Sequence, residues 1–130
     1  MGALEERVRV AQFRYDFDVH GGAVGDITLI GALPIDAIVV GGMIDVQTAG
    51  ASGGDATVAL KFETDEDVLT ATAGAVANLT EGAIIDIVPD HTAANAIRIV
   101  DADQMTMTIG TAALTAGKMV VHVEYLMPVN

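Results

Sequence analysis

Residues 104–126 carry a two-residue alternation of apolar and polar side chains on both sides of a connector rich in glycine, threonine and alanine. The apolar positions are Met105, Met107 and Ile109 before the connector and Met119, Val121, Val123 and Tyr125 after it. Val120 is an apolar exception among the polar positions of the second run. Successive side chains of a β-strand point to opposite faces, so this pattern is typical of half-buried antiparallel strands. We predict that the two runs form the final hairpin of the chain.

The same alternation, interrupted by turn residues, runs through most of the chain. Expected strands cover residues 7–20, 24–30, 37–40, 43–48, 56–63, 83–88 and 96–100, before the final hairpin. About eight short strands with turns at near-regular spacing favour a sandwich, a jelly roll or a small barrel. We predict an all-β fold: a single-domain β-sandwich or jelly roll of antiparallel strands over residues 7–130, preceded by a short N-terminal arm at residues 1–6.

Two places interrupt the expected strands. The apolar residues of the segment 7–20 change parity near Ala11 and Gln12, which predicts a bulge, a bend or a change of sheet there. Gly41 and Gly42 stand between two apolar runs and predict a break between strands.

Two further connections are predicted in the middle of the chain. The stretch 49–55, rich in glycine, predicts the turn of a hairpin over residues 43–63. An acidic start at residues 64–67 followed by apolar residues predicts one short helical turn there. The remainder up to residue 82 is rich in alanine and weakly patterned, so it predicts no strand.

Composition excludes several classes of function. The net charge of −12, from 18 acidic and 6 basic residues, argues against binding to a nucleic-acid backbone or an anionic membrane, because both need clustered lysine and arginine. No apolar run reaches the ~18 residues of a membrane helix. The first residues lack the pattern of a signal peptide, and the chain has no cysteine, so we expect synthesis in the cytoplasm and no disulfides.

Residues that could carry chemistry are scattered. His20, His91 and His122 match no zinc-ligand spacing. Acidic clusters occur at Asp16/Asp18, Asp65–Asp67, Asp86/Asp90 and Asp101/Asp103, and those at 65–67 and 101–103 lack the glycine and distal glutamate of a calcium loop. We predict no catalytic, cofactor or metal site, and a protein that is not an enzyme. Calcium binding, and a cupin-type enzyme with a histidine and carboxylate metal site, stay as alternatives.

Several segments together carry a resemblance to a known group of proteins: residues 7–17, 20–25, 33–40, 54–60 and 114–125. In their pattern of strands and turns they resemble small jelly-roll virion proteins of tailed bacteriophages, namely head decoration (cement) proteins and related head-fibre or tail accessory domains. The resemblance implies a β-sandwich that assembles as a homotrimer and binds the outside of a capsid at its local three-fold positions.

The resemblance therefore predicts a capsid decoration protein on the virion surface, whose partners are the major capsid protein and other copies of itself. A tail, baseplate or head-fibre accessory protein is the alternative within the same class. A carbohydrate-binding jelly roll is the alternative from another class, and it would need exposed aromatic rings. Candidate interface residues are Phe13, Tyr15, Met43 and Met127, and packing in the core is the other interpretation of each.

Overall fold

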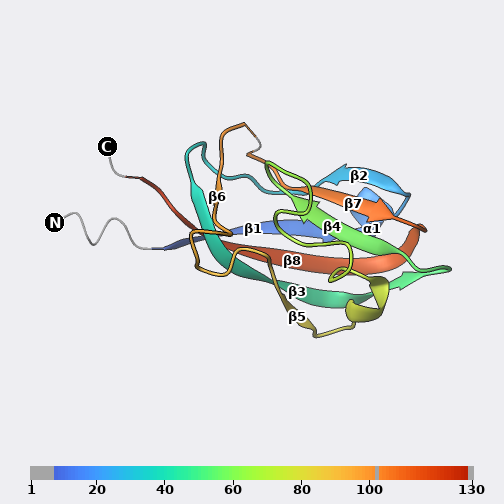
Figure 1. Cartoon of the computed structure of the whole chain (residues 1–130). Helices are drawn as coiled ribbons and strands as arrows, with labels where there is room; N and C mark the ends of the chain where they lie inside the picture. The colour runs from blue at the N-terminus through green and yellow to red at the C-terminus, as the bar shows by residue number, and fades with distance from the viewer. Residues whose placement is uncertain (1–7, 102, 129–130) are drawn as a thin grey trace.

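Two antiparallel sheets pack face to face in the computed structural model, which describes residues 8–101 and 103–128 (Figure 1). The five-stranded sheet has the order β1 (Arg9–Asp16), β8 (Leu114–Leu126), β3 (Ile38–Ser52) and β5 (Ile84–Asp86), with β6 (Ile97–Arg98) also paired to β3. The three-stranded sheet has the order β2 (Gly25–Thr28), β7 (Thr106–Gly110) and β4 (Thr57–Lys61). The helical segments are α1 (Phe17–His20) and the 3-10 helix η2 (Val76–Asn78). The predicted all-β sandwich is confirmed, whereas the expected arm at residues 1–6 lies outside the described residues.

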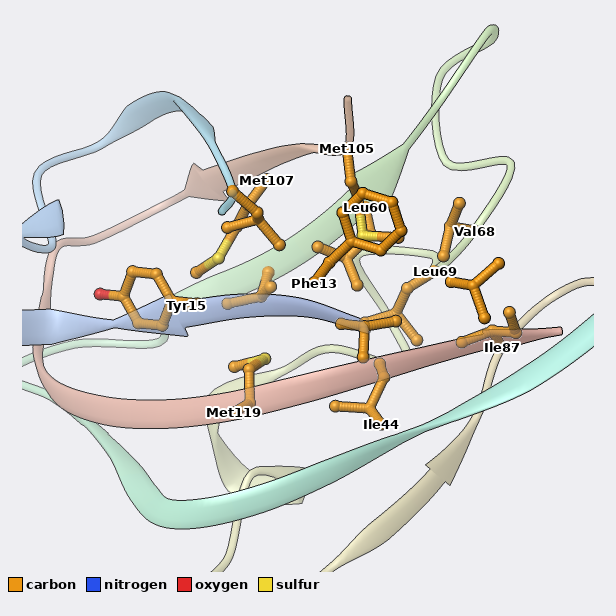
Figure 2. Close-up of a cluster of buried hydrophobic side chains, with 14 of the residues drawn as sticks. Phe13, Tyr15, Ile44, Leu60, Val68, Leu69, Ile87, Met105, Met107 and Met119 are labelled. Atoms are coloured by element: carbon orange, nitrogen blue, oxygen red, sulfur yellow. The ribbon is translucent and has the colours of Figure 1, made fainter. Parts of the chain in front are cut away.

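The core lies between the two sheets and is built from alternate residues of the strands. Figure 2 shows side chains of both sheets pointing into this space, among them Phe13, Ile44, Leu60, Met107 and Met119. The apolar positions read from the sequence of residues 105–123 are all buried. Each fully buried large aliphatic side chain stabilises the fold by about 1.5–3 kcal/mol relative to an exposed one. Packing the two sheets face to face buries the apolar side of the alternating strands, and this burial holds the sheets together.

The final two strands do not form the predicted hairpin. Strand β7 lies between β2 and β4, whereas β8 lies between β1 and β3 in the other sheet. The connector crosses from one sheet to the other, with Thr111 at a positive φ of 69°. The predicted hairpin over residues 43–63 is wrong for the same reason, because β3 and β4 belong to different sheets. Alternation specifies which side of a strand is buried, and it does not specify which strand lies beside it.

The first expected strand is shorter and more regular than predicted. Its pairing with β8 is continuous from Arg9, opposite Tyr125, to Asp16, opposite Lys118, so no bulge lies near residues 11 and 12. The exposed Val8 and Val10 account for the apparent change of parity. Residues 17–20 form α1 and are not a strand, because the Asp16 side chain caps the helix by accepting a hydrogen bond of 3.0 Å from the Asp18 N–H.

Strand β3 continues through the predicted break at Gly41 and Gly42. The pairing of β3 with β8 shifts between Val39 and Gly41, and Gly42 has a φ of 151°. A β-carbon at Gly42 would lie 2.1 Å from the carbonyl oxygen of His122. The two glycines therefore allow a bulge within one long strand, where the sequence predicted two shorter ones.

The acidic segment after β4 is a turn closed by a carboxylate. Asp67 accepts hydrogen bonds from the backbone N–H groups of Phe62, Glu63 and Thr64 at 2.7, 2.9 and 3.0 Å. The predicted helical turn at 64–71 is absent from this described stretch, because the carboxylate reaches backward to these N–H groups and caps no helix that follows. The helical segment in this part of the chain is η2, further on.

Candidate interaction surfaces

Two of the four predicted interface residues are core residues. Phe13 and Tyr15 expose 0% of their surface, so they present nothing to a second protein, and the prediction is corrected for both. Met127 is partly buried against the core. Met43 is 43% exposed on β3, where its neighbours in register are His122 and Asp86. The roles of Met43 and Met127 in an interface stay predictions.

The side of the five-stranded sheet that points away from the core is a mixed apolar and charged surface, which we call the outer face. It includes Val10, Gln12, Arg14 and Asp16 of β1, Lys118, Val120, His122 and Glu124 of β8, Met43 and Asp45 of β3, and Ile84 and Asp86 of β5. These residues alternate along their strands with the core residues, as the pleat requires.

One row of the outer face crosses the whole sheet. Arg14 is opposite Val120, Val120 is opposite Asp45, and Asp45 is opposite Ile84. An isolated bridge between Arg14 and Ile30 extends the row beyond β1. The row therefore reads apolar, positive, apolar, negative, apolar. Val120, at the centre of the row, is the apolar exception among the polar positions of residues 118–124.

Arg14 and Asp45 lie on either side of Val120 and are separated by two strand spacings, roughly 10 Å at the backbone. Within the described part of the chain, the ion pairs are Lys61 with Asp65 and His91 with Glu124, so neither Arg14 nor Asp45 forms one. Both side chains are free to pair with groups of another molecule.

Charge is distributed unevenly between this sheet and the rest of the protein. Four of the five basic residues that the structure describes lie on strands of the five-stranded sheet, together with four acidic residues: Arg9, Arg14, Arg98, Lys118, Asp16, Asp45, Asp86 and Glu124. The other twelve acidic residues within the described ranges accompany a single lysine, Lys61. The sheet is thus neutral, whereas the remainder of the surface is strongly acidic.

A hollow of about 570 Å³ lies over the three-stranded sheet. Its charged groups are engaged within the chain: Asp26 accepts from the Thr108 hydroxyl at 2.7 Å, and Lys61 pairs with Asp65 at 3.1 Å, a bond that raises the pKa of the lysine. Glu66 accepts a hydrogen bond of 2.5 Å from the Ala71 N–H. These contacts fix the turn after β4 against the sheet and account for the acidic cluster predicted there.

The three histidines each have a separate partner. His20 stacks on Tyr15 with ring centroids 5.5 Å apart, His91 lies 3.3 Å from a Glu124 carboxylate oxygen, and the ring of His122 is 3.5 Å from the Gln12 amide. Over residues 8–101 and 103–128, no three histidine or carboxylate side chains converge to hold a metal ion. The candidate calcium and cupin-type sites are therefore not assembled in this part of the chain.

Aromatic side chains contribute little to the exposed surface. The structure describes all five of them, and each is buried or half-buried: Phe13, Tyr15, Phe17, Phe62 and Tyr125. Sugar rings commonly stack on exposed aromatic rings, so this arrangement disfavours the carbohydrate-binding alternative. No helix in the described ranges is long and apolar enough to cross a membrane.

The charged row could not be predicted from the sequence pattern, because a row joins residues of different strands. Arg14, Asp45 and Ile84 are far apart in the chain, and only the sheet order brings them into line. A signal was present in Val120, whose apolar side chain at a polar position indicates an outward surface with apolar character.

Comparison with known proteins gives similarity in structure only. No protein-family model matches the chain, and no curated protein matches it. A chain in the capsid asymmetric unit of cyanophage Pam1 is similar with a TM-score of 0.67 and 17% identity, over 95% of this chain and 87% of that one. A chain in the capsid of Ralstonia phage GP4 is similar with a TM-score of 0.60 and 18% identity, over 95% and 86%. The resemblance to phage virion proteins is thus confirmed at the level of the fold.

Proposed function

We propose that this chain is a structural protein of a bacteriophage virion, and more specifically a capsid decoration protein that binds the major capsid protein on the outside of the shell. The observation that carries the proposal is the fold, which matches chains of two phage capsid structures over 95% of its length. The pattern of strands and turns in the sequence supports the same class of protein independently of the structures.

The physical basis of this role is rigidity combined with repeated contact. A protein that binds only the assembled shell stabilises it by mass action, without any chemical step. Many weak contacts repeated over a capsid add up through multivalency, most effectively if the protein is a homotrimer at three-fold positions. The continuous core between the two sheets supplies a body that keeps its shape. We accordingly propose a role without catalysis.

The first experiment measures the copy number of this chain in purified virus particles, by quantitative mass spectrometry against the major shell protein. We expect a ratio near one or a simple fraction such as one third. A handful of copies per particle would instead support the tail, baseplate or head-fibre alternative. Absence of the chain from the particles would contradict any structural role in the virion.

The second experiment tests stabilisation directly. Particles produced without this chain are heated with a dye that fluoresces on released DNA, before and after the purified chain is added back. We expect release at a lower temperature without the chain and recovery on addition, whereas an unrelated acidic protein of similar size restores nothing. Equal release temperatures with and without the chain would contradict a stabilising role and leave its location to the copy number.

A further inference from the structure

The row across the outer face is complementary to itself. In order it contains Ile30, Arg14, Val120, Asp45 and Ile84. A two-fold axis parallel to the strands and passing beside Val120 reverses this order in a second copy. Arg14 then lies opposite Asp45 of the second copy, Ile30 lies opposite its Ile84, and Val120 lies opposite its Val120. Such mutual correspondence defines an isologous contact between identical chains.

We propose that the outer face of the five-stranded sheet binds the same face of a second copy of this chain. Two sheets packed face to face are a stable arrangement when their side chains interdigitate about 10 Å apart. The inference goes beyond the proposed capsid role and does not depend on it. A two-fold contact of this kind is also separate from the three-fold contact of a trimer.

The two ends of the row are available for this contact, whereas Val120 at its centre is 8% exposed. Ile30 is 44% exposed and Ile84 is 58% exposed, which is unusual for isoleucine. A shallow hollow of about 260 Å³ beside Val120 has Ile30 on its lining, in position to receive Ile84 of the second copy. Arg14 and Asp45 have no ion-pair partner among the described residues, so pairing between copies leaves no charge of the row without a counter-charge.

Charge restricts which surfaces of two copies can meet. Each chain carries a net charge of −12, so two copies repel each other wherever their acidic surfaces meet. Outside the five-stranded sheet, twelve acidic residues of the described ranges accompany a single lysine, whereas the row on the outer face carries one positive and one negative side chain, Arg14 and Asp45. Along this row two copies therefore meet through opposite charges.

The area of the face suits a small interface. Four strands lie side by side, and β1 is eight residues long. At ~4.8 Å between strands and ~3.4 Å per residue, β1, β8 and β3 cover roughly 14 by 27 Å and the three residues of β5 add roughly 5 by 10 Å, or about 440 Å² in projection. Protruding side chains make the accessible area larger than the projection, and the contact belongs to the small interfaces, below the ~800 Å² per partner of a standard one.

The test measures the mass of the purified full chain by light scattering after size-exclusion chromatography, over a range of concentrations. The variants are Arg14→Asp, Asp45→Arg and the double substitution. We expect the unsubstituted chain to associate as a dimer, or as a hexamer where the three-fold contact also forms, and each single substitution to weaken the two-fold association at least tenfold, because like charges then oppose each other twice across the axis. The double substitution re-forms both pairs with exchanged signs and restores the dimer.

Matched controls separate this contact from effects of net charge. Lys61→Asp and Asp26→Arg make the same changes in charge on the three-stranded sheet, and we expect neither to weaken the dimer. Circular dichroism and thermal unfolding report whether each variant is folded. A chain that stays monomeric at high concentration, or a trimer, would contradict the proposal. So would a dimer that persists in both single variants, or one that the double substitution fails to restore.

Discussion

The hydroxyl of Tyr15 donates a hydrogen bond of 2.5 Å to the carbonyl oxygen of Gly21. This bond joins the end of β1 to the residue that follows α1, and the ring that carries the hydroxyl exposes 0% of its surface to solvent. The hydrogen bond therefore connects the corner between β1 and α1 to the hydrophobic core.

Tyr15→Phe is expected to keep the ring in the core and remove this bond. Because the carbonyl of Gly21 then loses a partly buried donor, we expect the free energy of unfolding to fall by about 1–2 kcal/mol. Urea unfolding followed by circular dichroism measures the change. An unfolding free energy equal to that of the unsubstituted chain would show that water replaces the hydroxyl at no cost.

The same tyrosine predicts a loss of stability in alkali. Burial, and secondarily the nearby Asp16 carboxylate, raise the pKa of Tyr15 to about 12 from its ordinary value of 10. Above pH 10 the unfolded chain releases this proton before the folded chain does, so the stabilisation is complete below pH 10 and is lost between pH 10 and 12. The free energy of unfolding therefore falls as the pH rises from 10 to 12.

Unfolding titrations between pH 8 and 12 measure this loss, with Tyr15→Phe as the control. The difference in unfolding free energy between the two chains should shrink as the pH rises above 10. Parallel curves for the two chains would contradict the assignment of the alkaline transition to Tyr15.

Gly42→Ala is expected to destabilise the protein strongly. The added β-carbon would meet the carbonyl oxygen of His122 at 2.1 Å, and the φ of 151° is strained for any residue with a side chain. We expect a loss of about 2 kcal/mol or more, since strain and displacement of β8 add together. Gly53→Ala, in open space, is the control and should change thermal stability little. Similar melting temperatures for the two variants would contradict the close contact at Gly42.

Asp67→Asn tests the carboxylate that closes the turn after β4. One carboxylate oxygen accepts from the N–H of Phe62 and the other from those of Glu63 and Thr64. An amide must direct its NH₂ group toward one of these donors, so we expect a loss of about 1.5–3 kcal/mol. Asp55→Asn, at an exposed position, is the control for the change of charge. Hydrogen exchange should also speed up at Phe62, Glu63 and Thr64; unchanged exchange there would count against a capping role.

Much of the local structure could be predicted from the sequence because alternation depends on neighbours in the chain. The apolar positions of β7 and β8 are buried as expected, and the turn residues separate most of the strands where they were placed. The helix α1 was missed because its four residues continue the apolar parity of β1, and only the cap at Asp16 marks its start. The glycines at 41 and 42 were misread because the same residue type serves at a turn and at a bulge.

Interface residues were harder to predict than the fold. Phe13 and Tyr15 were chosen for their aromatic character, yet the same character places them in the core. Exposed side chains form a continuous interaction surface only when strands from distant parts of the chain lie next to one another in the sheet. Arg14, Val120 and Asp45 illustrate this, since their register follows from β1 and β3 both pairing with β8.

The sequence by itself determined that this protein is an all-β sandwich with an aliphatic core and a large negative charge, because these properties depend on composition and on a repeat of two residues. Only the tertiary structure decided that β7 and β8 belong to different sheets and that Arg14 and Asp45 stand on either side of Val120. The physical reason is that a strand's pattern fixes its buried side, whereas its neighbours are chosen by the packing of the whole core.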